Sequence, residues 1–184
     1  MWRPFVHFDP WDVAASCAGS PLNAKEHYEL RVLGFVLPAL LNAPPARIIK
    51  RESPDFEVVT TQGAMLVELV DAVPDAVSDS GTMNLAKRRS RPSSDFYHVE
   101  AAQFGAVIAT QIEAKRAKAR DWLQRDPAFQ GRFILGVNVG QGPLSITEYL
   151  RSADQTAQLV PLNTIEPFQA VVLADGSGAY LWRA

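Results

Sequence analysis

Three acidic residues in one short stretch, Asp55, Glu57 and Glu68, have the types and spacing of a cation-binding site. They belong to the segment ESPDFEVVTTQGAMLVELV, which begins at Glu52 and contains two runs of alternating apolar residues joined at Gln62-Gly63. This alternation, with a glycine at the junction, predicts a β-hairpin. Carboxylates gathered on one face of a hairpin repel one another unless a cation lies between them. A hard cation such as Mg²⁺ prefers these oxygen ligands, so the hairpin is a candidate metal site.

The length of the hairpin loop decides whether the three acids meet. A loop with an even number of residues puts all three side chains on one face, because side chains alternate along a strand. With Gln62-Gly63 as a two-residue loop, we expect Glu57 directly across from Glu68 and Asp55 diagonal to it. An odd loop would split the set. The alternative interpretation is that Glu57 and Glu68 are solvent-facing residues of an amphipathic hairpin.

A helix is predicted before the hairpin, with Asn23 or Ser20 as its N-cap and leucines at helical spacing up to Pro44-Pro45. Glu26 and Glu29 lie one turn before Leu30 and Leu33 and extend the buried stripe toward the N-terminal end. They are therefore candidates to join the acidic site. Each glutamate taken alone is more simply explained by the helix dipole, which favours acidic residues in a first turn.

A second, longer helix is predicted from about Val99 to Gln124 by an apolar stripe at helical spacing. Lys115 falls on this stripe, one turn after Gln111, and Lys118 borders it. A lysine on a core-facing stripe must extend to solvent or find an anion. The acidic hairpin would supply that anion, which makes the two lysines candidate partners of its carboxylates.

The remaining apolar runs predict further strands and a single domain of the α/β class. The order of helix, strand, hairpin, helix and strands is typical of a mixed sheet covered by helices. We expect one domain over residues 1–184, with a core at 22–140 and a C-terminal extension at 141–184 that ends in an extra β-hairpin. Residues 1–20 are expected to be irregular. Single strands are predicted at 47–51, 133–139, 170–173 and 180–182.

Composition sets broad limits on function. The chain has 184 residues, of which 47% are hydrophobic and 21% charged, as in an ordinary soluble globular domain. A single cysteine excludes an internal disulfide, and no apolar run reaches membrane-spanning length, so we expect a cytoplasmic protein that does not bind membranes. The net charge of −2 does not indicate a nucleic-acid binder. The polar connection 74–98 holds a basic cluster that could contact phosphates, although its charges are more simply explained by a solvated loop. The cluster consists of Lys87, Arg88, Arg89 and Arg91.

The element order α-β-β-β-α-β, with Pro54-Asp55 opening one strand and Glu68 in the next, resembles the PD-(D/E)XK nuclease superfamily. The resemblance covers about residues 22–140 and is closest to poorly characterised bacterial branches. It implies a three-layer α-β-α restriction-endonuclease-like core with a mixed central sheet. It also implies that Asp55 and Glu68 bind Mg²⁺ (or Mn²⁺), with Glu26 or Glu29 of the first helix as a further ligand.

The chain departs from this superfamily at Val70, where a lysine that activates the attacking water is expected. Lys115 is the candidate replacement, and Gln111 resembles a polar helix residue of some branches, with Lys118 and Glu57 as supporting residues. The sequence therefore predicts a metal-dependent nuclease whose partner is DNA or RNA. The alternatives are a catalytically inactive member that serves as a binding or assembly module, and an unrelated α/β domain with an acidic hairpin. The sequence does not fix the oligomeric state, and a homodimer is one option.

Overall fold

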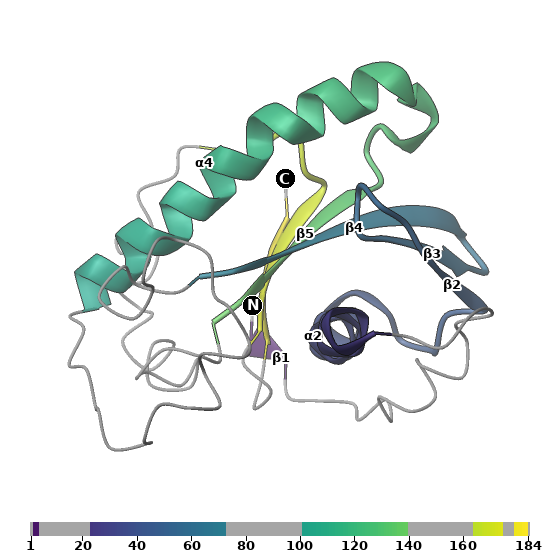
Figure 1. Ribbon diagram of the computed structural model, residues 1–184, viewed down its shortest axis with the longest axis horizontal. Coiled ribbons are helices and arrows are strands. Elements are labelled where there is room, and N and C mark those ends of the chain that lie inside the picture. The colour runs from purple at the N-terminus through teal and green to yellow at the C-terminus, as the bar shows by residue number, and fades with distance from the viewer. Residues whose placement is uncertain (1, 4–22, 73–100, 140–163, 175–178, 184) are drawn as a thin grey trace.

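The computed structural model describes residues 2–3, 23–72, 101–139, 164–174 and 179–183 (Figure 1). Within them lie two long helices, one short 3₁₀ helix and seven strands, so the predicted α/β class is confirmed. The elements, in chain order, are β1 (Trp2–Arg3), α2 (Ala24–Leu40), β2 (Arg47–Lys50), β3 (Phe56–Thr60), β4 (Gly63–Asp71), α4 (Ala101–Arg125), η2 (Pro127–Phe129), β5 (Phe133–Asn138), β6 (Ala170–Ala174) and β7 (Ala179–Arg183).

All seven strands form one mixed sheet in the order β1-β7-β6-β5-β4-β3-β2. Strands β2, β3 and β4 run antiparallel as consecutive neighbours, whereas β4, β5 and β6 are parallel. Helix α4 makes the crossover that a parallel β4–β5 pair requires. Strand β7 returns antiparallel to β6, which confirms the predicted C-terminal pair of strands. The first strand, Trp2–Arg3, pairs with β7, so the expectation that residues 1–20 are wholly irregular was wrong at these two positions.

The two long helices cover opposite faces of the sheet (Figure 1). Buried residues of α2, among them Leu33 and Leu37, pack with Phe56 and Val67 in one hydrophobic cluster. The second cluster lies under α4 and includes Ile112 and residues of β4, β5 and β6. Strand β5 is buried along its whole length, as expected for a parallel strand with helices on both faces.

The hairpin β3–β4 has the even loop that was predicted but a different register. Thr60 pairs with Gly63, so the loop is Thr61-Gln62, and Glu57 lies opposite Leu66 rather than opposite Glu68. The Thr60 hydroxyl fixes this loop, because it donates to the Gly63 carbonyl at 2.9 Å and accepts from the Gln62 amide at 3.1 Å. Gly63 is needed directly after the loop, where its φ of 115° disfavours other residues.

This register has a direct consequence for the acids. Continuing the pairing of Phe56 with Val67 by one residue brings Asp55 directly opposite Glu68. Relative to the prediction, the partner of Glu57 on β4 shifts by two residues, from Glu68 to Leu66. Because two is even, Glu57 and Glu68 still share one face of the hairpin. The pair predicted to be diagonal is therefore the pair that lies face to face.

Some predictions fall outside the described residues. They concern the polar connection 74–98 with its basic cluster at Lys87, Arg88, Arg89 and Arg91. In the part of the chain that the structure describes, neither long helix has a stretch apolar enough to cross a lipid bilayer.

Candidate functional site

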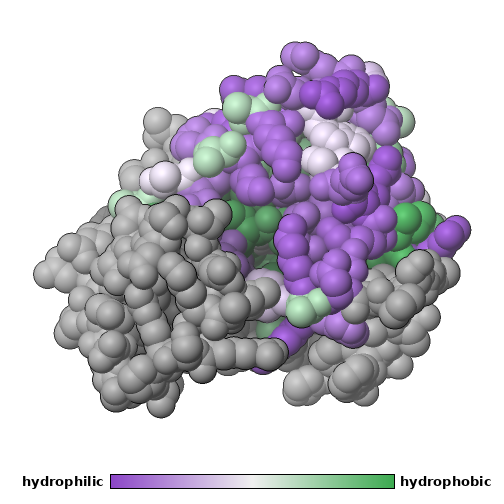
Figure 2. Space-filling model, in the orientation of Figure 1, coloured by the Kyte–Doolittle hydropathy of each residue, from purple (hydrophilic) through white to green (hydrophobic). Residues whose placement is uncertain are grey.

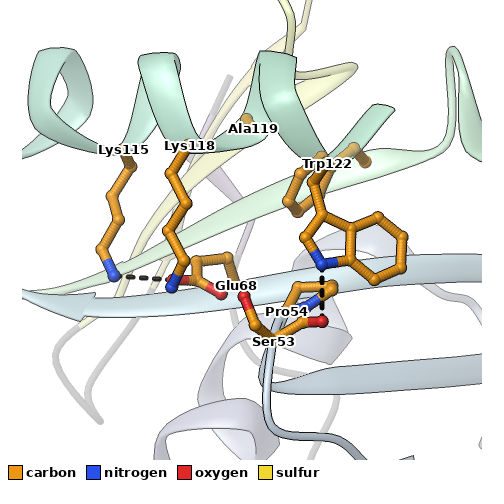
Figure 3. A pocket seen from close by; sticks show the side chains of 8 residues that line it. Ser53, Pro54, Glu68, Lys115, Lys118, Ala119 and Trp122 are labelled. Atoms are coloured by element: carbon orange, nitrogen blue, oxygen red, sulfur yellow. Dashed lines mark hydrogen bonds and ion pairs between the residues drawn. The ribbon is translucent and has the colours of Figure 1, made fainter. Parts of the chain in front are cut away.

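Glu68 is a buried carboxylate on the α4 face of the sheet, held by two lysines of that helix (Figure 3). Only 4% of the residue is exposed. Its Oε1 accepts a hydrogen bond from Lys115 Nζ at 2.6 Å and another from Lys118 Nζ at 3.0 Å. Burial alone would raise the pKa of Glu68, but the hydrogen bonds and charges of Lys115 and Lys118 outweigh it and lower the pKa below its ordinary value. Glu68 is thus held as an anion.

The helical spacing of the two lysines explains why both reach one oxygen. Residues three apart on a helix lie on the same face, so the stems of Lys115 and Lys118 descend side by side toward β4 (Figure 3). Their exposures differ, since the Lys115 side chain is 24% exposed and that of Lys118 is 52% exposed. Two ammonium groups on one carboxylate leave a net positive charge, and the more exposed Lys118 is the one that a ligand reaches from solvent.

Asp55 stands at the entrance of β3, directly after Pro54. Its Oδ2 accepts a hydrogen bond from the backbone N–H of Leu69 at 2.7 Å, in the place where a further backbone pairing of β3 with β4 would be. Burial raises the pKa of Asp55, and the negative charge of Glu68 raises it further, against the Leu69 hydrogen bond and the Lys50 ammonium. The two acids across the strands therefore sense each other's charge.

A second lysine-centred group adjoins Asp55 on the α2 side. Lys50 Nζ lies 2.9 Å from Oε2 of Glu29 and 3.6 Å from Oδ1 of Asp55. The approach to Glu29 is an ion pair without hydrogen-bond geometry, since this buried oxygen accepts no hydrogen bond. Glu29 is 8% exposed and also pairs with Lys25 at 3.4 Å. Lys50 thus links the first helix to Asp55.

Between the two first-helix acids, Glu29 is the one joined to Asp55. The carboxylate of Glu26 instead accepts a hydrogen bond from the backbone N–H of Asn23 at 2.8 Å, and the Asn23 side chain accepts one from the Glu26 amide at 3.0 Å. This capping box satisfies amides at the start of α2. The alternative interpretation of Glu26 as a helix-start acid therefore describes its position, whereas Glu29 is buried among charged partners.

Glu57 shares the α4 side with Glu68 but has its own partner. Its Oε2 lies 2.6 Å from the guanidinium of Arg51, which in turn stacks 5.2 Å above the ring of Trp122. Trp122 donates its indole N–H to the carbonyl of Ser53 at 2.6 Å (Figure 3). Gln111, one turn before Lys115, is half-buried on the same helix. Glu57 and Trp122 thus brace the segment that leads into Asp55.

Side chains of α4, β4 and the segment before β3 border a hollow beside Glu68 (Figure 3). Charged groups from Lys115 and Lys118 stand at one end of it, and the indole of Trp122 stands at the other. The visible surface over the C-terminal half of α4 is mostly hydrophilic, with an apolar area beneath the helix (Figure 2). The hollow is lined by Ser53, Pro54, Glu68, Lys115, Lys118, Ala119, Trp122 and Phe133.

Within the described residues, no three His, Cys, Asp or Glu side chains converge as a ready metal cage. A site built on Asp55 and Glu68 alone still suits Mg²⁺, which is commonly bound by one or two carboxylates and completes its shell with water and substrate phosphate. Burial, and after it the negative charge of Glu68, raises the pKa of Asp55, and a nearby cation would oppose both effects by favouring the anion. Asp55 and Glu68 are the two carboxylates available to such an ion here, and each already faces a lysine ammonium.

Two features of this region were missed by sequence reasoning. Lys50 was placed only as part of a strand, although the run Lys50-Arg51 directly before an acidic segment is a signal of charge pairing. The other is a polar cluster in which Asp71 Oδ1 accepts from the Tyr28 hydroxyl at 2.6 Å and from the Asn138 amide at 2.7 Å. It joins α2 to the carboxyl ends of β4 and β5.

Comparison of the chain with family models, with curated proteins and with solved structures found no match.

Proposed function

We propose that this protein is a metal-dependent phosphodiesterase that acts on DNA or RNA and has a restriction-endonuclease-like core. The observation that carries the proposal is the proximity of two acids, since Glu68 lies on β4, next to β3, and its charge raises the pKa of Asp55. Asp55 directly precedes β3, whose first residue Phe56 pairs with Val67 beside Glu68 of β4, and Lys115 of the crossover helix lies 2.6 Å from Glu68. This set combines metal-binding carboxylates with an amine, as phosphodiester hydrolysis requires.

The topology supports the same proposal. The order α2, β2, β3, β4, α4, β5, with three antiparallel strands followed by a crossover to a parallel strand, is the order of the superfamily that the sequence resembles. In such an arrangement the Pro-Asp strand and the Glu strand are neighbours. A fold alone does not determine activity, so the proposed activity depends on the acids and lysines of the site.

Asp55 and Glu68 would hold a Mg²⁺ or Mn²⁺ ion, which supplies a positive charge on the scissile phosphate and a more acidic bound water. The protein's own groups would do the rest. Lys115, half-buried against Glu68, would keep that acid ionised and present an ammonium to the developing negative charge. Lys118, half exposed at the edge of the hollow, would contact a phosphate of the incoming strand.

Cleavage assays with a matched acid control test this proposal. Purified protein would be incubated with Mg²⁺ or Mn²⁺ and with single- and double-stranded DNA and RNA. We expect cleavage that is lost in Asp55→Asn and Glu68→Gln but kept in Glu57→Gln, because Glu57 lies on the same hairpin and pairs with Arg51 instead. Absence of cleavage in every combination, or full cleavage by Asp55→Asn, would refute the proposed activity.

A second function, that of a catalytically silent binding or assembly module, is favoured by one observation. The charge of Glu68 is already balanced by two lysines, so a cation must displace ammonium groups to reach it. Calorimetric titration with Mn²⁺ separates the two functions. The phosphodiesterase requires binding that is weakened by Glu68→Gln, whereas a silent module gives no heat of binding that depends on Asp55 or Glu68.

A further inference from the structure

We propose that Lys50 is a positioning residue that fixes the carboxylate of Asp55 by holding the β2–β3 connection and by neutralising Glu29 beside it. The ammonium of Lys50 reaches four oxygen atoms of three residues. The consequence for metal binding rests on the proposed function, whereas the consequence for the position of Asp55 does not.

The connection from β2 to β3 folds back on Lys50. The Arg51 amide donates to the Asp55 carbonyl at 2.9 Å, which closes residues 51–55 into a tight loop. Lys50 Nζ donates to the carbonyls of Arg51 at 3.1 Å and of Asp55 at 3.2 Å. The same ammonium lies 4.7 Å above the ring of Phe56, which orients its stem. The backbone of Asp55 is therefore tied to Lys50 independently of its side chain.

The carboxylate of Asp55 is held from two sides. Oδ2 receives the Leu69 N–H at 2.7 Å, and Oδ1 faces Lys50 Nζ at 3.6 Å. The Leu69 amide is thus a built-in reporter, because it is protected from solvent exchange only while the Asp55 side chain stays in this orientation. The amide of Leu66, which donates to the Arg132 carbonyl at 2.9 Å, reports on β4 without contacting Asp55.

Lys50 also separates two acids that would otherwise repel. Glu29 is buried, and the ammonium between it and Asp55 offsets both charges. Lys25 offers a matched control, since it pairs with the same glutamate at 3.4 Å but its side chain is 76% exposed. An exposed pair of this kind contributes little, so loss of Lys25 leaves the arrangement of Asp55 intact.

The first test is hydrogen exchange by NMR in the presence of a chelator. In Lys50→Met we expect exchange at the Leu69 amide to rise about five- to tenfold relative to the Leu66 amide, as loss of one hydrogen bond implies. Lys50→Arg should restore part of the protection, and Lys25→Met should leave the ratio unchanged. An unchanged ratio in Lys50→Met would overturn the inference. If Lys50→Met does not fold, the same comparison is made in a Glu29→Gln background, which removes the uncompensated acid.

The second test is Mn²⁺ affinity, measured by calorimetry on the same variants. Removal of a positive charge beside Asp55 would by electrostatics alone tighten Mn²⁺ binding. If Lys50 orients the Asp55 carboxylate, its loss instead weakens Mn²⁺ binding, and we expect the Kd of Lys50→Met to be at least about tenfold higher. Tighter binding by Lys50→Met would overturn the positioning role. If the unmodified protein binds no Mn²⁺, the proposed metal-dependent function fails, and the exchange ratio at Leu69 alone decides the role of Lys50.

Discussion

The two lysines on Glu68 should contribute unequally to stability, and Lys115→Met compared with Lys118→Met measures the difference. Breaking a buried ion pair costs about 3–5 kcal/mol, because one charge stays buried without its partner. Exposed pairs contribute about 0–1 kcal/mol. Since the side chain of Glu68 is 5% exposed and that of Lys115 is 24% exposed, the pair lies nearer the buried limit. Lys118 remains as a partial counter-ion, so we expect a loss of about 2 kcal/mol for Lys115→Met.

The loss for Lys118→Met should be smaller, below about 1 kcal/mol, because this side chain is 52% exposed and its contact is longer. Both replacements keep an unbranched stem, so the packing of α4 on the sheet is preserved. Equilibrium unfolding in urea near neutral pH, with a chelator present, gives the free energies of unfolding directly. Equal losses for the two variants would refute the argument from burial.

The pH dependence provides a second check on the same pair. The pKa of Glu68 is lower in the folded protein than its ordinary value of 4.5, because the two lysines stabilise the anion. Its contribution to stability is therefore present above pH 4.5 and is lost as the pH falls through the folded pKa. We expect the difference between unmodified protein and Lys115→Met to shrink as the pH is lowered below 4.5. A constant difference would show that the lost stability has another cause.

Three further predictions concern the surroundings of the site. Asp55→Asn should raise the urea midpoint at neutral pH. Burial and the charge of Glu68 raise the pKa of Asp55, so the stability of the unmodified protein falls as the pH rises above 3.8 through the folded pKa. An unchanged midpoint would contradict this. Gly136→Ala should cost about 1–3 kcal/mol in the same assay, because its Cβ would lie 2.6 Å from Leu69 Cδ2 and 2.8 Å from Val36 Cγ2. Trp122→Phe should cost about 1–2 kcal/mol by leaving a carbonyl of the β2–β3 connection without its 2.6 Å hydrogen bond, and a neutral result would show that water replaces the indole.

Much of the fold was predictable because the periodic signals in this chain are strong. The helix predicted from about Val99 to Gln124 is α4, Ala101–Arg125, and the predicted strand 133–139 is β5, Phe133–Asn138. Asn23 was one of two N-cap candidates and forms the cap. These elements have long apolar stripes or runs, which local sequence determines well.

The register of the hairpin was not predictable from the same kind of signal. The sequence places a glycine after Gln62, and a two-residue loop can be formed by Gln62-Gly63 or by Thr61-Gln62. The choice is made by Thr60, whose hydroxyl bonds within the turn, and by Arg132, which packs 3.0 Å from where a Cβ of Gly63 would be. Glu57 and Glu68 share a face whenever the loop has an even number of residues. The predicted and the observed loop both have two residues, so this part of the prediction holds.

The role of Lys50 depended on contacts that no local pattern contains. Its partners come from the β2–β3 connection and from a glutamate twenty-one residues earlier, so the group exists only once α2 has packed beside these strands. The pairing of Lys115 with the hairpin was predictable, because a lysine on an apolar helical stripe needs an anion and Glu68 was the nearest supply of one.

Val70 lies on the face of β4 that α4 covers, beside the contact of Glu68 with the helix lysines. Residue 70 is two residues after Glu68 on β4 and therefore on the same face, where Val70 packs against the cluster under α4. A lysine there would bring a third ammonium to the side on which Lys115 and Lys118 already meet Glu68. It would also replace an apolar contact between the helix and the sheet. The valine and the helix lysines are thus two parts of one arrangement, in which β4 contributes packing and α4 contributes charge.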